Sequence, residues 1–595
     1  MPNSPVNYKP GTDRTPQETE NSSMAFTDTN NVHFPDGRLR TVDPWSDVSP
    51  VSPDVLGGAR SIFGHIRSDG IYYLFGTSSR LYAIKNGTWY NITPLETSST
   101  AIANSLDTVA ASAVITVNRT SHGLTDGDRI KIEGAATTDG IPASEINAEH
   151  IITYIDADSF SITVSTTATA GGTGGGGAST VMYDPIDAGN LDVELGSGYG
   201  MGFYGPGLYG VSKSSTANTL KYPRIWSFDS FGDSMIMCPG DYDAGDGQKI
   251  YIWDGDTDTA PTVLTNAPTD CNYVFVFNNA VVALCGNRVD ISNVGDATIW
   301  TPSVSVSAFS TDIERVRRLI SGTRVGELAL IFTEDEVLLL RWVNEPDYYF
   351  VEDLMDSDGL LAPNGFCVHE QVCYWMGQRG FYSFNRSGVQ RLQNIQNEDW
   401  IFDNINEGQQ WKSFGVADTK HNQVWFYFPT AAADEPSDYV IYNLQGGHWT
   451  LGIQSRTAIM RNGFVGGRLY GIFGDSTSQP ASVYRHFLES NSSLNLAPYA
   501  ETSFGMIGEG DYKFRINRVM PDTYQNGDII LNVITKEYPQ SQTEHTANYT
   551  LTATQEYLNT RVSGRVRKYR IEQNSNGAYF TMGNWKEDIK RQGLR

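Results

Sequence analysis

The chain has 595 residues, of which 39% are hydrophobic and only 19% charged, which excludes general disorder and allows large cores. A formal net charge of −25 excludes a protein that reads nucleic acid through a broadly basic surface. The five cysteines include no C-x-x-C spacing, so we expect neither a disulfide framework nor a structural zinc site, and synthesis in a reducing cytoplasm.

The N-terminal segment is polar and rich in proline. Its first residues, MPNSPVNYKPGTDRTPQETENSS, lack the charged and then apolar pattern of a secretory signal. No apolar run in the chain approaches the roughly 20 residues of a membrane-spanning helix. We therefore predict an extended arm over residues 1–54 and no membrane-spanning segment.

A repeated pattern follows the arm. The stretch IYYLFGTSSRLYAIKNGTWYNITP (71–94) is an apolar run, a polar turn, a second apolar run and a tryptophan. Stretches of the same kind begin at Ser234, Ala280, Glu327, Val372, Val424 and Arg468. Starts about 45 to 50 residues apart are typical of four-stranded propeller blades. The fold class predicted is all-β, with a β-propeller of about seven repeats over residues 55–99 and 183–497.

One gap interrupts this period. Residues 100–182 contain the alternating segments AVITV, RIKIEG, HIITYI and SFSITV, separated by Asp-Gly and Gly-rich turns. We interpret them as a small β-domain, a sandwich or barrel, inserted into a propeller loop and closed by the flexible GGTGGGG.

The insert is followed by a glycine-rich segment, GSGYGMGFYGPGLYG (196–210). It contains a loose G-x-G-x-x-G, but FYGPGLYG cannot start the helix that a phosphate cradle needs. We interpret it as an adaptable channel or contact loop, whose candidate residues are Tyr199, Met201, Phe203, Tyr204 and Tyr209.

The C-terminal region, residues 498–595, alternates as strands do and has an Asn-Gly turn at Asn526-Gly527, which predicts a β-sandwich. Residues 511–595 hold 13 Lys and Arg against 9 Asp and Glu, a net +4, which leaves −29 for the first 510 residues. An acidic body with a mildly basic tail domain favours a self-complementary assembly.

Two acidic loops are candidates for ion binding. DYDAGDGQK holds Asp241, Asp243 and Asp246, and DGDTDTA holds Asp254, Asp256 and Asp258. Such bunched carboxylates suit Ca²⁺, although neither loop has the EF-hand spacing. Solvated turns capped by Asp side chains are the alternative.

The basic run RVSGRVRKYR offers Arg565, Arg567, Lys568 and Arg570 on a predicted strand. They form either a contact with an acidic partner or passing nucleic acid, or an edge strand guarded by charge against aggregation.

Catalytic signatures do not stand out in the sequence. It contains no G-x-S-x-G, its nine histidines are scattered and none lies in H-E-x-x-H. We predict a protein that is not an enzyme and needs no cofactor.

Several stretches resemble one family. DGRLRTVDPW (36–45), the stretch at 71–94 and YPRIWSFDSFGDSMIM (222–237) are similar to the tail hub or nozzle proteins of short-tailed bacteriophages, which include packaged-DNA stabilisation proteins. The insert's SHGLTDGDRIKIEGAATTDGIPASEIN resembles a small module of phage virion proteins, and RVSGRVRKYRIEQNSNGAYFTMGNWKEDI is similar to the family's last domain. The resemblance covers most of residues 36–590.

This resemblance implies a structural protein of the virion tail, assembled in the host cytoplasm. It would form a homo-oligomeric ring of about six copies below the portal and the adaptor, or head-to-tail connector. The ring would continue the DNA channel, retain packaged DNA without reading its sequence, and anchor fibres or a needle. The alternative is a propeller-type glycan-binding protein or depolymerase of a phage tail, since exposed Trp and Tyr also stack on sugars.

Overall fold

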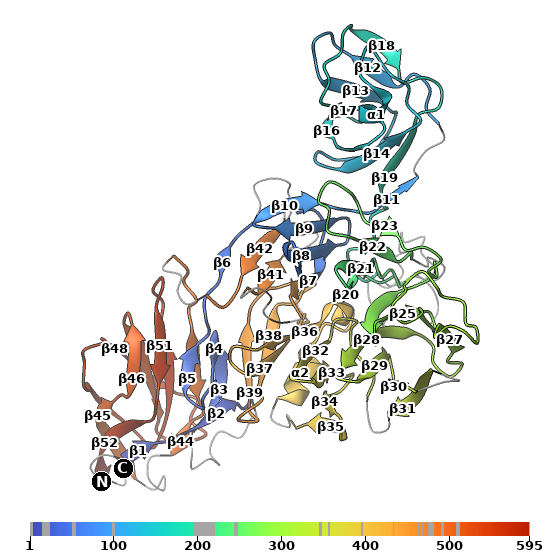
Figure 1. Cartoon of the computed structure of the whole chain (residues 1–595). Coiled ribbons are helices and arrows are strands. Elements are labelled where there is room, and N and C mark those ends of the chain that lie inside the picture. Colours follow the sequence, from blue (N-terminus) through green and yellow to red (C-terminus); the bar gives the residue numbers. More distant parts are fainter. Residues whose placement is uncertain are drawn as a thin grey trace, which may run out of the picture.

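The computed structural model describes residues 4–14, 24–49, 55–97, 101–194, 221–242, 248–343, 348–354, 358–393, 397–431, 433–461, 463, 465, 468–473, 481–488, 493–506 and 512–593. Over these residues the protein is all-β and consists of many small, mainly antiparallel sheets (Figure 1). They gather into a middle body, an inserted body and a terminal body.

The middle body contains seven four-stranded antiparallel sheets. The first four are β7–β10 (Ala59–Arg67, Gly70–Thr77, Leu81–Lys85, Thr88–Asn91), β20–β23 (Ser227–Phe231, Ser234–Cys238, Tyr251–Trp253, Thr262–Val263), β24–β27 (Tyr273–Phe277, Ala280–Cys285, Arg288–Ile291, Phe309–Asp312) and β28–β31 (Leu319–Val325, Leu328–Thr333, Val337–Trp342, Tyr349–Leu354). The next two are β32–β35 (Phe366–His369, Val372–Met376, Phe381–Asn385, Gly388–Leu392) and β36–β39 (Phe414–Asp418, Gln423–Phe428, Asp438–Asn443, Trp449–Ile453). The last comprises β40 (Ala458–Ile459), β41 (Tyr470–Phe473), β42 (Ser482–Arg485) and β6 (Ser46–Asp47).

Each stretch of the repeated sequence pattern begins at or next to the second strand of one of these sheets. Ser234, Ala280 and Val372 are the first residues of β21, β25 and β33. The runs are apolar at successive positions because both faces of a sheet are covered, and every residue of β24 and β25 is buried. The repeat in the sequence is therefore a repeat of antiparallel sheets.

Consecutive sheets share hydrophobic cores. Separate clusters join the first sheet to the second, the second to the third, the third to the fourth, the fourth to the fifth and the fifth to the sixth. A further cluster combines the sixth, seventh and first sheets, with Trp425, Ile472 and Phe75 among its members. Strand β40 also packs against β7. The last sheets thus pack back on the first.

The seventh sheet is completed from the N-terminal part of the chain. In β6, Ser46 and Asp47 pair antiparallel with Arg485 and Tyr484 of β42. The Val48 N–H donates to the Val483 carbonyl over 2.8 Å. This strand comes from more than 400 residues earlier in the chain, as the separation of 434 residues between Ser49 and Val483 shows.

The inserted body lies between the first and second sheets in the sequence and has its own core. One sheet has the order β11-β19-β14-β15 and the other β16-β17-β13-β12-β18. The bounds are β11 Leu95–Thr97, β12 Leu106–Thr108, β13 Val114–Asn118, β14 Arg129–Glu133, α1 Ala143–Ile146, β15 Glu149–Ile151, β16 Thr153–Asp156, β17 Ser159–Thr163, β18 Gly172–Gly175 and β19 Val181–Pro185.

The terminal body combines strands from both ends of the chain. Its sheets have the orders β1-β52-β45-β49, β2-β3-β43-β50-β47-β48 with β44 paired to β50, and β4-β5-β51-β46. The bounds are β1 Ser4–Val6, β2 Tyr8–Thr12, β3 Met24–Asn30, β4 Val32–His33, β5 Leu39–Thr41, β43 Tyr499–Thr502, β44 Gly505–Met506, β45 Lys513–Met520, β46 Thr523–Asn526, β47 Ile529–Lys536, β48 His545–Leu551, β49 Leu558–Gly564, β50 Val566–Glu572, β51 Tyr579–Met582 and β52 Trp585–Gly593.

The N-terminal segment is not the extended arm that its polar composition predicted. Phe26 and Val32 are fully buried and share a core with Ile516 and Phe580. The few apolar residues of this segment pack against residues some 500 positions later in the chain. This distant packing, and not the polar local composition, determines the conformation of the segment.

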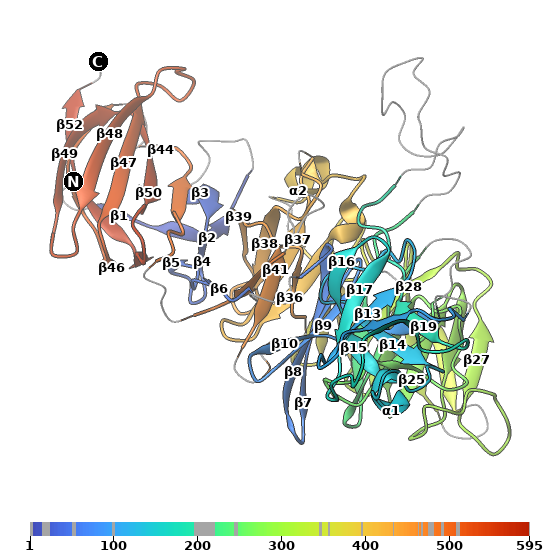
Figure 2. The same cartoon turned by 90° about the horizontal axis from the view of Figure 1, so that it is seen from above.

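The terminal body and the inserted body extend from different places on the middle body (Figure 1). Figure 1 shows the terminal body at one end, the middle body next to it and the inserted body projecting at the far end. The view from above, Figure 2, also separates the terminal body from the sheets of the middle body. The helices are short: α1 in the inserted body, α2 (Glu398–Asn404) and a 3-10 turn at Gln410–Lys412. Within the described ranges, no helix has the length and apolar character needed to cross a bilayer.

Candidate functional site

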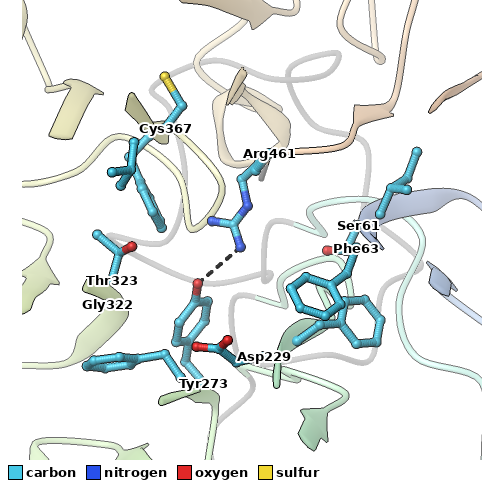
Figure 3. Close-up of a pocket in the computed structure, with 13 residues that line it drawn as sticks. Ser61, Phe63, Asp229, Tyr273, Gly322, Thr323, Cys367 and Arg461 are labelled. Atoms are coloured by element: carbon cyan, nitrogen blue, oxygen red, sulfur yellow. Dashed lines mark hydrogen bonds between the residues drawn. The ribbon is translucent and has the colours of Figure 1, made fainter. Parts of the chain in front are cut away.

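A cavity of about 300 Å³ lies among the first strands of the middle body's sheets (Figure 3). Strands β7, β20, β24, β28 and β32 line it, and Arg461 reaches it from the segment after β40. Its lining residues are Ser61, Ile62, Phe63, Phe228, Asp229, Tyr273, Phe275, Gly322, Thr323, Phe366, Cys367, Val368 and Arg461. Residues from five sheets and from the segment after β40 thus meet at one place.

Asp229 is positioned by strand alternation in SFDSF of β20. Ser227 and Asp229 lie on the same face, where Ser227 Oγ accepts the Val274 N–H (3.0 Å) and Asp229 Oδ2 accepts the Val276 N–H (2.7 Å). The Ser230 N–H donates to Asp229 Oδ1 (2.7 Å). Burial raises the pKa of this carboxyl, and the backbone donors oppose the increase. Asp229 therefore fixes β24 against β20 and also faces the cavity.

Arg461 supplies the cavity's cation. Its Nη2 donates to the Tyr273 hydroxyl over 3.2 Å, and its guanidinium lies 4.6 Å from the centroid of the Phe366 ring. Its Nη1 is buried and has no hydrogen-bond partner among the described residues. Figure 3 shows Tyr273, Asp229 and Arg461 directed into the same space. The cavity thus offers donors from Arg461 and an acceptor from Asp229 between aromatic walls.

Cys367 offers the cavity no nucleophile. Burial raises the pKa of its thiol, and the nearby Arg461 only partly opposes this. Because the thiolate is the reactive form, a thiol held protonated is a packing group.

A buried ionic cluster lies beside the cavity. Arg60, which precedes the lining residue Ser61, pairs through Nη2 with Glu435 Oε1 (2.7 Å). Lys412 Nζ lies 3.2 Å from the same oxygen and 2.6 Å from Asp192 Oδ1. The charges of Arg60 and Lys412 are thus matched by carboxylates, whereas Arg461 makes no ion pair with a described residue.

The first acidic loop is only partly described. Asp241 is buried and forms an ion pair with Arg224, with Nη2 and Oδ2 separated by 2.6 Å. An arginine thus occupies the place that a calcium ion would take at this carboxylate. Asp243 and Asp246 lie outside the described residues.

The second acidic loop forms turns and a contact. Asp254 Oδ1 accepts the Asp256 N–H and Asp256 Oδ1 accepts the Asp258 N–H, each over 3.0 Å, as capping Asp side chains do. The carbonyls of Thr257 and Asp258 accept from Arg129 of the inserted body. The loop therefore serves the joint between two bodies.

The basic run is engaged within the chain. Arg567 is buried, and its Nε pairs with Glu587 Oε1 over 2.8 Å, so the prediction that this residue contacts a partner is wrong. Lys568 and Arg570 both pair with Glu501, and Arg565 lies over the Tyr538 ring. The edge-guard interpretation is also wrong, because β50 lies between β43 and β47. Strand β50 is central in its sheet because β43 and β47 pair with its two edges, and the sequence of the basic run does not specify these partners.

The predicted contact-loop residues Tyr199, Met201, Phe203, Tyr204 and Tyr209 lie outside the described residues. Their role in a channel or a contact stays a prediction.

One further group has metal-ligand character. Ligand atoms of Asp270, Cys271 and Cys285 lie within 4.8 Å of one another, and Asp270 also pairs with Arg288 at 2.8 Å. These three residues supply one ligand fewer than the four of a structural zinc site. Burial raises the pKa of the Cys271 thiol, which opposes the deprotonation that metal binding needs.

Sequence reasoning missed the three polar residues of the cavity, Asp229, Tyr273 and Arg461. They lie on different sheets, and no motif spacing joins residues so far apart in the chain. The only local signal was the spacing of Ser227 and Asp229 in SFDSF, which places two polar side chains on one face of the strand.

Comparisons with known proteins add no family. No family model and no curated protein matches the sequence. Among solved structures, the computationally designed Ika8 protein is 8% identical with a TM-score of 0.32, over 74% of this chain and 99% of its own. The phage phi92 endosialidase is 11% identical with a TM-score of 0.19, over 82% and 68%. An exo-beta-1,3-galactanase from Phanerochaete chrysosporium is 9% identical with a TM-score of 0.21, over 61% and 95%. At these TM-scores the likenesses carry no argument.

Proposed function

We propose that this chain is a non-enzymatic structural protein of a bacteriophage tail, a nozzle or hub subunit that assembles into a ring of about six copies. The ring lies below the portal and adaptor, continues the DNA channel, retains packaged DNA and anchors fibres or a needle in the virion tail. The proposal starts from the sequence resemblance over residues 36–590, and the arrangement of the molecule supports it.

The middle body in this proposal is a seven-bladed β-propeller. Seven four-stranded sheets, a hydrophobic cluster shared by each consecutive pair and a cluster that combines the sixth, seventh and first sheets support this interpretation. Pairing of β6 with β42 supports closure of the ring of blades by a strand from the other end of the sequence.

The observation that carries the structural role is the pair of end bodies with exposed apolar side chains. In the inserted body, Ile151, Tyr154 and Ile155 are exposed, and Tyr154 and Ile155 lie on the edge strand β16. In the terminal body, Tyr524 and Tyr538 are exposed. Such side chains suit contacts with neighbouring proteins, and their separation along the molecule suits a subunit that contacts partners at both ends.

The charge supports passage of DNA rather than its binding. With a net charge of −25, a channel wall built from these chains repels phosphate. A basic wall would instead gain affinity through counterion release at each contacted phosphate. Retained DNA can then leave quickly once the channel opens.

A second candidate function is that of a glycan-binding protein or depolymerase of a phage tail. The observation that favours it is the exposed tyrosine pair of the terminal body, Tyr524 and Tyr579, with ring centroids 6.1 Å apart on neighbouring strands. Aromatic faces of this kind stack on sugar rings. Loss of glycan-array signal in Tyr524→Ala would support this candidate.

The deciding experiment measures the mass of the purified full chain by light scattering, with negative-stain images, alone and with a portal–adaptor complex. We expect rings with a central channel, and a lower ring fraction for Ile155→Lys or Tyr524→Lys. Val304→Lys, at a fully exposed position of the middle body, is the matched control. A compact monomer that never joins the complex would overturn the proposal.

A further inference from the structure

The central cavity has one polar group that the protein leaves unsatisfied. Arg461 Nη1 is buried without a hydrogen-bond partner among the described residues, although Nη2 reaches Tyr273. A buried donor without a partner destabilises the fold, and a charged donor does so more strongly. An acceptor that enters the cavity, such as a ligand oxygen or a water molecule, can complete this guanidinium.

Tyr273 adds a second donor at the same place. Its hydroxyl oxygen accepts from Arg461 Nη2, so its own proton is directed elsewhere. No other hydrogen bond of this hydroxyl is present among the described residues. Arg461 Nη1 and the Tyr273 hydroxyl are thus two donors at one place, and the two oxygens of a carboxylate can accept from them, with the bond to Arg461 strengthened by charge.

Asp229 offers hydrogen-bond acceptors in the same cavity. Each of its oxygens accepts one backbone N–H, which leaves further acceptor capacity on both. A ligand hydroxyl or ammonium group beside the carboxylate would satisfy it. Phe63, Phe228 and Phe275 supply apolar walls for a short carbon skeleton.

We propose that this cavity binds a small molecule that carries a carboxylate next to a hydroxyl or ammonium group. Arg461 and Tyr273 hold the carboxylate, and Asp229 accepts from the neighbouring donor. The volume of about 300 Å³ is at the lower end of small-molecule pockets, which limits the ligand to roughly the size of an amino acid or an acidic monosaccharide. This site is independent of ring assembly and goes beyond the structural role.

The test is calorimetric titration of the full chain with glutamate, glucuronate and galactose. Glutamate and glucuronate represent the two sources of the proposed chemistry, and galactose lacks the carboxylate. We expect one of the two carboxylates to bind and to raise the thermal midpoint, and galactose to give no heat. Arg461→Met should weaken binding at least tenfold, and Tyr273→Phe should weaken it several-fold.

Arg317→Met is the matched control, because Arg317 is exposed and outside the cavity, and it should bind as the wild type does. Absence of binding by both carboxylates at millimolar concentration would overturn the proposal. So would galactose binding as well as glucuronate, or unchanged affinity in a folded Arg461→Met. If Arg461→Met fails to fold, Tyr273→Phe decides. Ring mass measured on the same variants separates this result from the proposed tail function.

Discussion

His33 and His421 pack edge to face, with ring centroids 4.9 Å apart, where the terminal body meets the sixth sheet of the middle body. His33 is fully buried, and its Nδ1 lies 3.1 Å from Gln423 Oε1. His421 Nδ1 lies 2.7 Å from Asp418 Oδ2. Its Nε2 lies 3.5 Å from Asp43, which also pairs with Arg40 and Lys420. Burial, and secondly His421, lowers the pKa of His33 to about 4.

This pKa predicts loss of stability in acid. The folded-state pKa of His33 lies below its unfolded value of 6.5, so its neutral form contributes stability that is fully present above pH 6.5. That stability is lost as the pH falls from 6.5 towards about 4, by up to about 1.4 kcal/mol per pH unit. Thermal midpoints measured across this range should fall less steeply in His33→Gln than in the wild type.

His545→Gln, at an exposed position, is the control and should keep the wild-type slope. Other buried histidines, such as His486, also have lowered pKa values and contribute to the common slope. Identical slopes for wild type and His33→Gln would show that this junction does not sense pH.

At the scale of the elements, the two-residue strand β6 completes the seventh sheet of the middle body. Two paired residues and the Val48 N–H join it to β42, and the Ala481 N–H donates to the Val55 carbonyl just beyond it. These bonds supply the fourth strand of the seventh sheet. The stability of that sheet therefore depends on a segment outside the repeated sequence pattern.

Val48→Pro should loosen this sheet, because proline lacks the N–H that donates to Val483. The buried acceptor left behind costs about 1–3 kcal/mol. Hydrogen exchange should become faster in β41 and β42 and stay unchanged in β47 and β50 of the terminal body. Val48→Ala keeps the N–H and should exchange nearly as the wild type does. Uniform protection in Val48→Pro would argue that β6 is dispensable.

At the scale of the whole molecule, polar contacts join the inserted body to the middle body, and Arg129 makes several of them. Arg129 Nε donates to the Asn91 carbonyl (3.1 Å) and Nη2 to the Thr257 carbonyl (2.8 Å). Arg80 and Asp128 form a second link across the same joint, with Nη2 and Oδ2 separated by 2.7 Å. The joint is polar, whereas the core of the inserted body is its own. We therefore expect the inserted body to keep its fold when contacts at this joint are lost.

Arg129→Met should free the inserted body to reorient while its fold persists. Small-angle scattering should show a larger radius of gyration, and hydrogen exchange should become faster in the 254–260 loop. Lys131→Met, on the same strand and paired only with Glu133 among ion pairs of the described residues, should leave both measurements unchanged. If Arg129→Met gives the same scattering profile as the wild type, Arg129 is not needed to hold the two bodies together, and the contact between Arg80 and Asp128 would be the next one to test.

The fold also determines which charged side chains of the terminal body are available to a partner. The basic run around Arg567 raised the expectation of an attractive patch, but its ion pairs with Glu501 and Glu587 neutralise it within the terminal body.

The sequence by itself indicated that the chain is all-β and showed the spacing of the repeated stretches. These features can be seen in short stretches of sequence. Strands β24 and β25 are apolar at every position because both of their faces are buried. In β13 and β17, apolar and polar residues alternate. Asn526-Gly527 forms a turn because Gly527 adopts a φ of 87°, which glycine tolerates. That turn links strands of two different sheets, β46 and β47, which the dipeptide alone does not specify.

Tertiary structure alone decided which strands pair across hundreds of residues and which polar groups meet. The pairing of β6 with β42, the burial of Phe26 in the terminal body, and the meeting of Asp229, Tyr273 and Arg461 all depend on closure of the chain over long distances. Backbone pairing is almost independent of side-chain identity, so it leaves no motif in the sequence. Shared burial, which only the folded chain provides, selects these partners.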